Sequence, residues 1–211
     1  MVDLNLSWQR VEQGLSFSSD CLEIDKKLFS LYSESHRKYH SLQHLSECIT
    51  WFQVVSQLAQ HPAEVEAALW FHDAIYELKQ HDNEERSASW ARTVLLEAGA
   101  PTASACRVEN LILATKHTAL PVLPDEQLLV DIDLSILGTS ELRFAEYQCQ
   151  IREEYSFVPE AVFREKRRYI LRSFIDRERI YRTDYFHDAL EERARANLLR
   201  AISEIEHPPR P

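Results

Sequence analysis

The sequence predicts an all-α protein, and three observations support this prediction. Apolar residues recur at helical spacing along most of the chain, and short stretches containing proline or glycine separate these periodic segments. No segment reads as a convincing β-strand. Only three glycines occur in 211 residues, which fits long helices and argues against a glycine-rich phosphate loop. We therefore expect one helical bundle of roughly nine helices, forming a single domain over the whole chain.

The composition is that of an ordinary soluble globular protein, with 45% hydrophobic and 27% charged residues. The net charge of −10 disfavours duplex nucleic acid as a partner, because nucleic-acid binders normally carry a basic face. The four cysteines lie far apart and form no Cys-x-x-Cys pair. The sequence shows neither a signal peptide nor an apolar run long enough to span a bilayer. We expect a cytoplasmic protein without membrane contact.

The first half of the chain predicts four helices after a polar N-terminal segment. The first covers about residues 20–37, and Ser41 caps the second, which runs to about residue 60. Pro62 then stands at the first turn of a third helix, which carries His72 and Asp73. Asp82 and Glu85 form the pattern of a capping box for the fourth helix, which ends near Gly99.

The second half predicts five further helices, separated by Pro, Gly and Ser. These helices cover residues 102–117, 125–137, 140–155, 159–175 and 188–205. A proline-containing linker at 121–124 follows the first of them, and Gly138 stops the second. We expect residues 206–211 to form a frayed tail.

Histidine and aspartate residues gather in three apolar segments, which indicates a buried metal site. His72 and Asp73 follow a strongly apolar stretch, where ionised carboxylates are rare unless paired or bound to a metal. His40 and His44 share one face if both are helical. Taken alone, His72 and Asp73 could be a surface pair, and His44 could be a hydrogen-bonded core residue. Bundles commonly build metal sites from such inward-facing side chains.

The order of these residues resembles the HD-domain superfamily of metal-dependent phosphohydrolases, and more closely a bacterial subgroup of predicted HD phosphohydrolases. The resemblance covers about residues 37–199. It rests on short motifs in the correct order: Arg37–Leu45, Phe71–Tyr76, Asp82–Ala88, Ala114–His117, Asp131–Gly138, Arg152–Tyr155 and Glu191–Leu198.

The resemblance implies a role for each residue that matches a motif. The implied metal ligands are His44, His72, Asp73 and Asp133, with Asp133 chosen over Asp131. The residues implied to lie near the substrate are Arg37, His40 and Lys116, and those implied to act in catalysis are Lys116, His117 and Glu77. One departure concerns the general base. Some family members have glutamate three residues after the motif aspartate, where this chain has Tyr76, with Glu77 one residue later.

The implied activity is hydrolysis of a small phosphate ester, such as a nucleotide, assisted by a divalent ion. Such an ion lowers the pKa of a bound water and polarises a phosphoryl oxygen. Imidazole and carboxylate ligands leave the metal open among Mn, Fe, Co, Ni, Zn and Mg. For Lys116 and His117, the alternative is a cation pair at a helix C-terminus without catalytic role.

Two other functions stay open at this point. One is a metal-binding regulatory or scaffold protein without catalysis. The other is a di-iron oxygenase or lyase of the HD type, for which His117 and His40 are the only obvious spare ligands.

Overall fold

The protein is all-helical, as the sequence predicts. The computed structural model describes residues 2–18, 23–117 and 119–207, and these residues form ten α-helices, two short 3-10 helices and no strand. In these ranges no helix combines the length and the apolar character that crossing a bilayer requires. The all-α class and the approximate number of helices are confirmed.

The contacts of the chain divide it into two compact units, Met1–Asp133 (unit 1) and Leu134–Pro211 (unit 2). Each unit is described separately below. The expectation that residues 1–211 form a single domain stays a prediction.

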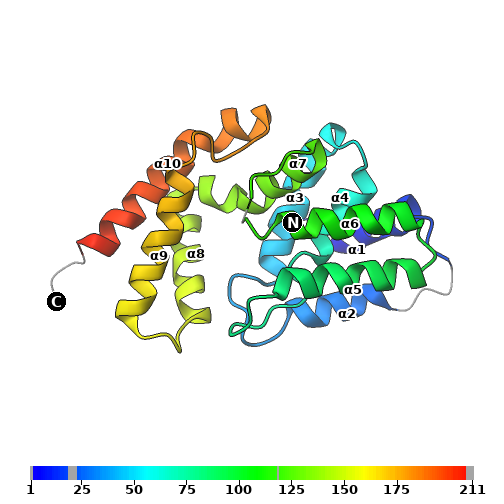
Figure 1. The fold of residues 1–211 in the computed structure, drawn as a ribbon, viewed down its shortest axis with the longest axis horizontal. Helices are drawn as coiled ribbons and strands as arrows, with labels where there is room; N and C mark the ends of the chain where they lie inside the picture. The colour runs from blue at the N-terminus through cyan, green and yellow to red at the C-terminus, as the bar shows by residue number, and fades with distance from the viewer. Residues whose placement is uncertain (1, 19–22, 118, 208–211) are drawn as a thin grey trace. The chain divides into compact units, whose positions relative to one another are not determined.

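Unit 1 contains seven α-helices among its described residues. They are α1 (Leu4–Gly14), α2 (Ile24–Tyr32), α3 (Leu42–Val55), α4 (Pro62–Phe71), α5 (Asn83–Glu97), α6 (Thr102–Ala114) and α7 (Pro124–Asp133), with the 3-10 helix η1 (Ser56–Leu58) after α3. Helices α5 and α6 lie side by side and form the most extensive helix pair (Figure 1).

Helix α4 is the centre of unit 1. Every residue from Glu64 to Phe71 is buried, and α4 contacts α1, α3, α5, α6 and α7. A helix that is apolar on all sides must be enclosed on all sides. Its two acidic residues are both paired. Arg107 donates to Glu64 through two nitrogens at 2.6 and 2.7 Å, and Glu66 accepts from Ser7 at 2.6 Å. Because α4 is packed on all sides, it holds the residues that follow its C-terminal end, His72 and Asp73, in a fixed position.

Helix α1 was not predicted, because we took residues 1–13 as a polar segment. Asp3 caps this helix by accepting hydrogen bonds from two backbone N–H groups of the first turn. Only Ser7, Trp8 and Val11 of α1 are buried. Because the buried face of α1 contains only three residues, the rest of the segment is polar. The helical spacing of apolar residues therefore could not be recognised in the sequence.

Several predicted helix boundaries are confirmed, and the predicted capping box of α5 is wrong. The Ser41 side chain accepts a backbone hydrogen bond as the cap of α3. Gly99 has φ +91°, the left-handed conformation that ends α5. Asp82 stands at the cap position of α5, but its side chain makes no capping hydrogen bond. The Glu85 side chain forms an ion pair with Lys116 instead of completing a capping box.

Unit 2 contains the 3-10 helix η2 (Leu134–Gly138) and three α-helices, α8 (Glu141–Glu154), α9 (Glu160–Ile175) and α10 (Asp184–Glu206). Helix α10 begins four residues earlier than predicted, because Thr183 caps it by accepting from the backbone N–H of Phe186. It packs against η2 and α9. Residues 208–211 of the predicted frayed tail lie outside the described residues.

Candidate metal centre

Three helices of unit 1 bring together the four residues predicted as metal ligands. His44 lies in the first turns of α3, His72 caps the C-terminal end of α4, Asp73 follows it, and Asp133 is the last residue of α7. We expected His72 and Asp73 inside a helix. His72 keeps a helical backbone (φ −57°, ψ −37°), but the helix has ended at Phe71.

The donor atoms of these residues face one another at short distances. His44 Nε2 lies 3.1 Å from His72 Nε2, 3.4 Å from Asp73 Oδ2 and 3.2 Å from Asp133 Oδ1. His72 Nε2 lies 3.1 Å from Asp73 Oδ2 and 3.6 Å from Asp133 Oδ1. Both imidazoles are buried, whereas the side chains of Asp73 and Asp133 keep 17% and 15% of their exposure. The cluster therefore reaches solvent on its carboxylate side.

These distances fit a single ion bound between the four donors. Nitrogen and oxygen ligands lie about 2.0–2.2 Å from a transition metal. Two donors bound at that distance are about 3.0 Å apart at a right angle and about 3.4 Å apart at the tetrahedral angle. The observed separations of 3.1–3.6 Å fall in or near this range. The group can hold a metal ion.

The backbone of α4 fixes the orientation of His72. Its Nδ1 lies 2.8 Å from the carbonyl oxygen of Leu69. A carbonyl only accepts, so Nδ1 carries the proton and donates it. In the neutral imidazole Nε2 then presents its lone pair to the cluster. A ligating histidine is commonly held in this way by a hydrogen bond at its other ring nitrogen.

Charges within the cluster hold its carboxylates in the ionised form. Burial would raise the pKa of Asp73 and Asp133, but the neighbouring imidazoles outweigh it and hold both pKa values well below the usual range. Burial would conversely lower the pKa of His72, and the charge of Asp73 raises it instead. Protons on the imidazoles therefore balance the carboxylates, and a bound cation would replace those protons.

Cys48 is a member of the cluster that the sequence analysis missed. Taking one donor atom from each residue, Cys48, His44, His72 and Asp133 lie within 4.8 Å of one another. Cys48 is 1% exposed, and its Sγ lies 3.7 Å from His44 Nδ1. The signal was present in the sequence, because His44 and Cys48 are four residues apart on one helix.

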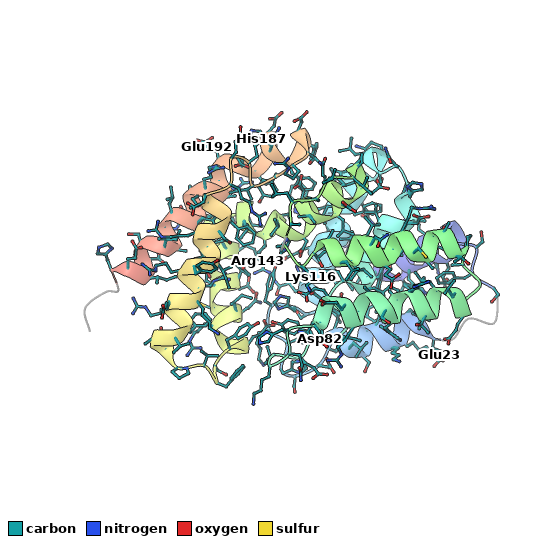
Figure 2. All side chains as sticks on the ribbon, in the orientation of Figure 1. Glu23, Asp82, Lys116, Arg143, His187 and Glu192 are labelled. Carbon is teal, nitrogen blue, oxygen red and sulfur yellow. The ribbon has the colours of Figure 1, made fainter. Side chains whose placement is uncertain are left out.

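Lys116 and His117 lie beyond the end of α6 rather than inside the helix predicted over 102–117. Figure 2 labels Lys116. His117 has φ +55°, and its Nε2 lies 3.2 Å from Asp133 Oδ2, the carboxylate oxygen that does not face His44. The structure thus brings His117 to the cluster. Lys116 forms an ion pair with Glu85.

Arg37 and His40 lie next to the metal ligands in the chain segment before α3. The buried guanidinium of Arg37 donates to the carbonyl oxygens of Asp73 (2.6 Å), Ala74 (2.9 Å) and His40 (3.2 Å). These contacts give Arg37 a role in holding the backbone at Asp73. The His40 ring stacks on Tyr76 with centroids 4.1 Å apart. Their roles in substrate binding stay predictions.

His40 does not share a helix with His44, because α3 begins at Leu42. The condition under which both histidines would share one helical face, that both are helical, is therefore not met. The rings are nevertheless close, with centroids 6.1 Å apart.

The structure gives the two glutamates near the cluster different surroundings. The Glu77 side chain is half exposed and accepts from Arg86 at 2.7 Å, so the contact that it makes is outside the cluster. Glu84, in the first turn of α5, is partly buried. Burial raises its pKa, and the negative charges of Asp73 and Glu85 add to this effect. Glu84 is thus electrostatically coupled to the site.

Asp131 is fully buried in α7, two residues before the candidate ligand Asp133. Among the described residues, the group with metal-binding geometry includes Asp133 and not Asp131. The choice of Asp133 over Asp131 as the last ligand stays a prediction.

Comparisons with known proteins add no family to this description. No protein-family model, no curated protein and no solved structure matches the chain.

Proposed function

We propose that the protein is a divalent-metal-dependent phosphohydrolase of the HD type, acting on a small phosphate ester such as a nucleotide. The observation that carries this proposal is the set of two imidazoles and two carboxylates, in which the two imidazole nitrogens lie 3.1 Å from each other and 3.1–3.6 Å from the carboxylate oxygens. The order of these residues along the chain, which resembles the HD superfamily, supports it further.

In this proposal the protein supplies four metal ligands in fixed positions, and one side of the site is open to solvent. His44 and His72 form the buried side, while Asp73 and Asp133 border solvent. The bound ion supplies a water of lowered pKa and polarises a phosphoryl oxygen. The donor set suits Mn, Fe, Co, Ni or Zn better than Mg, which prefers oxygen ligands.

The residues around the ligands would act on charge and orientation. His117 Nε2 can donate to Asp133 Oδ2, which fixes the carboxylate so that Oδ1 faces the imidazoles. The Lys116 ammonium, released from Glu85, would offset charge on the phosphate. Glu84 is a better candidate than Glu77 for a group that accepts a proton near the ion, because Glu84 is partly buried, whereas Glu77 is half exposed and paired with Arg86.

The test is phosphate release from a panel of nucleoside monophosphates by the full chain reloaded with each candidate metal. We expect turnover with at least one transition metal. Lys116→Ala should keep one equivalent of metal while its phosphatase rate falls on the order of a hundredfold, because removal of a group that stabilises charge in the transition state costs about this much.

Two controls make the result specific. His81 is exposed, so His81→Ala should leave both metal content and rate unchanged. A fully metal-loaded protein without activity on any ester would reject the hydrolase and favour the non-catalytic metal-binding alternative.

A further inference from the structure

Cys48 gives the metal centre a fifth donor of a different chemical kind. Its thiol is buried beside His44, with Sγ 3.7 and 3.8 Å from the two ring nitrogens. The other four donors are imidazole nitrogens and carboxylate oxygens. A sulfur atom in this position is not needed for phosphate hydrolysis as proposed above.

The cluster therefore contains two overlapping ligand sets. Both include His44, His72 and Asp133, and they differ in whether Asp73 or Cys48 completes the set. Carboxylate oxygen is a hard ligand that suits ions such as Mn²⁺, whereas thiolate is a soft ligand that suits Zn²⁺ and heavier ions.

The geometry allows Cys48 to reach an ion held by the imidazoles. His44 and Cys48 project from the same face of α3 because they are four residues apart. A metal–sulfur bond of about 2.3 Å and a metal–nitrogen bond of about 2.1 Å place the two donors about 3.6 Å apart at the tetrahedral angle. The observed distance between Sγ and His44 Nε2 is 3.8 Å. All four donor atoms of this set lie within 4.8 Å of one another, so binding one ion would require the wider separations to shorten by at most roughly an ångström.

We propose that Cys48 is a conditional ligand, which a thiophilic ion engages and an oxygen-preferring ion leaves as a thiol. The inference rests on the proposed metal centre. When the metal–sulfur bond forms, the thiol proton leaves to the buffer and no electron is transferred.

The consequence is regulation by the choice of metal. Four protein ligands close a tetrahedral zinc site, whereas a six-coordinate ion on the set with Asp73 keeps two positions for water and a phosphoryl oxygen. Zn²⁺ bound through Cys48 would therefore inhibit the hydrolase.

The test uses cadmium binding by the full chain in which Cys21, Cys106 and Cys149 are replaced by serine. This protein should bind one equivalent of Cd²⁺ and show the ultraviolet charge-transfer band of a cadmium–thiolate bond. The same protein with Cys48→Ser should lack the band. Its affinity for Cd²⁺ should fall on the order of tenfold to a hundredfold, while its affinity for Mn²⁺ should change less than about threefold.

The outcomes separate this inference from the proposed function. One bound equivalent of Cd²⁺ without the band overturns the role of Cys48 and leaves the metal centre intact. Failure to bind either Cd²⁺ or Mn²⁺ overturns the metal centre, and with it both proposals. If Cys48→Ser does not fold, cadmium NMR of the protein with Cys48 alone decides, because a shift typical of nitrogen and oxygen ligands would refute the sulfur ligand.

Discussion

Glu191 in unit 2 and the pair Asp73 and Asp133 in unit 1 are carboxylates largely withdrawn from solvent, and their charges are neutralised in different ways. In unit 2, Glu191 accepts hydrogen bonds from the backbone N–H groups of Ile180 and Tyr181 at 3.1–3.2 Å and from the guanidinium of Arg195 at 2.8 Å. The imidazole of His187 lies farther away, with Nδ1 3.4 Å from Glu191 Oε2. In unit 1, Asp73 and Asp133 face imidazole nitrogens. The chain therefore supplies every partner of Glu191, whereas the unit 1 cluster needs added protons or a cation.

The comparison offers a criterion for separating structural from functional buried charge. A buried carboxylate whose partners are backbone N–H groups and arginine is complete in the folded protein, and it stabilises the fold. Carboxylates and imidazoles whose lone pairs converge on one point are neutralised only when protons or a metal cation bind between them. The following predictions test this difference, in order of expected effect.

Removal of one imidazole from the cluster should abolish metal binding. Wild-type protein in a thousandfold excess of metal over Kd should gain about 4 kcal/mol in free energy of unfolding, because the ion binds the folded state. His72→Ala should show no such gain and no bound equivalent in elemental analysis. Retention of a full equivalent of metal would exclude His72 as a ligand. It would also contradict the view that the unit 1 cluster, unlike Glu191, is neutralised by a cation.

The two aspartates of α7 should differ in their effect on metal affinity. Asp133→Asn should weaken binding on the order of a hundredfold, because its Oδ1 faces both imidazoles. Asp131→Asn should have a smaller effect. Calorimetric titration of both variants measures the difference, and the reverse order would reassign the last ligand to Asp131.

Loss of the Glu191 charge should reduce stability without any effect on metal binding. Glu191→Gln weakens hydrogen bonds to two backbone N–H groups and one guanidinium, so we expect a loss of about 2 kcal/mol in urea unfolding. Glu192→Gln is a matched control, because Glu192 is the exposed neighbour on α10 (Figure 2). An equal loss of stability in both variants would refute the structural role of Glu191.

The stabilisation by Glu191 should depend on pH in a defined direction. Burial would raise the pKa of Glu191, but hydrogen bonds from Ile180, Tyr181 and Arg195 lower it below the ordinary value of 4.5. The folded state therefore binds this proton less readily than the unfolded state. The stabilisation should be complete above pH 4.5 and should disappear as pH falls through the lowered pKa. The difference in free energy of unfolding between wild type and Glu191→Gln, measured from pH 7 downward, should begin to shrink near pH 4.5. It should be lost once the pH is below the lowered pKa.

The sequence predicted those parts of the structure that local chemistry determines. Ser41, Pro62 and Gly99 mark helix boundaries through capping, a fixed φ and a left-handed φ, and all three stand where the pattern placed them. The Asp82 capping box failed because Lys116, distant in sequence, takes the Glu85 carboxylate. A tertiary contact of this kind leaves no local signal.

The candidate site was predicted in part for the same reason. The histidine and aspartate motifs predicted that His44, His72, Asp73 and Asp133 converge, and their donor atoms do lie together. Cys48 was missed because a buried cysteine on an apolar helix face looks like a core residue. The spacing of His44 and Cys48 placed both on one face of α3, but the packing of α3 on α4 and α7 is what brings the sulfur within 4.8 Å of donor atoms from His72 and Asp133.

The burial of α4 from Glu64 to Phe71 has a consequence for how the metal centre responds to fluctuations. The backbone amide hydrogens of a helix that is enclosed by neighbouring helices exchange with solvent only when the whole cooperative unit opens. The Leu69 carbonyl that orients His72 belongs to this helix. Local fraying at the surface of unit 1 would therefore leave the imidazole aligned, and release of the ion would follow dissociation from an intact site rather than partial unfolding.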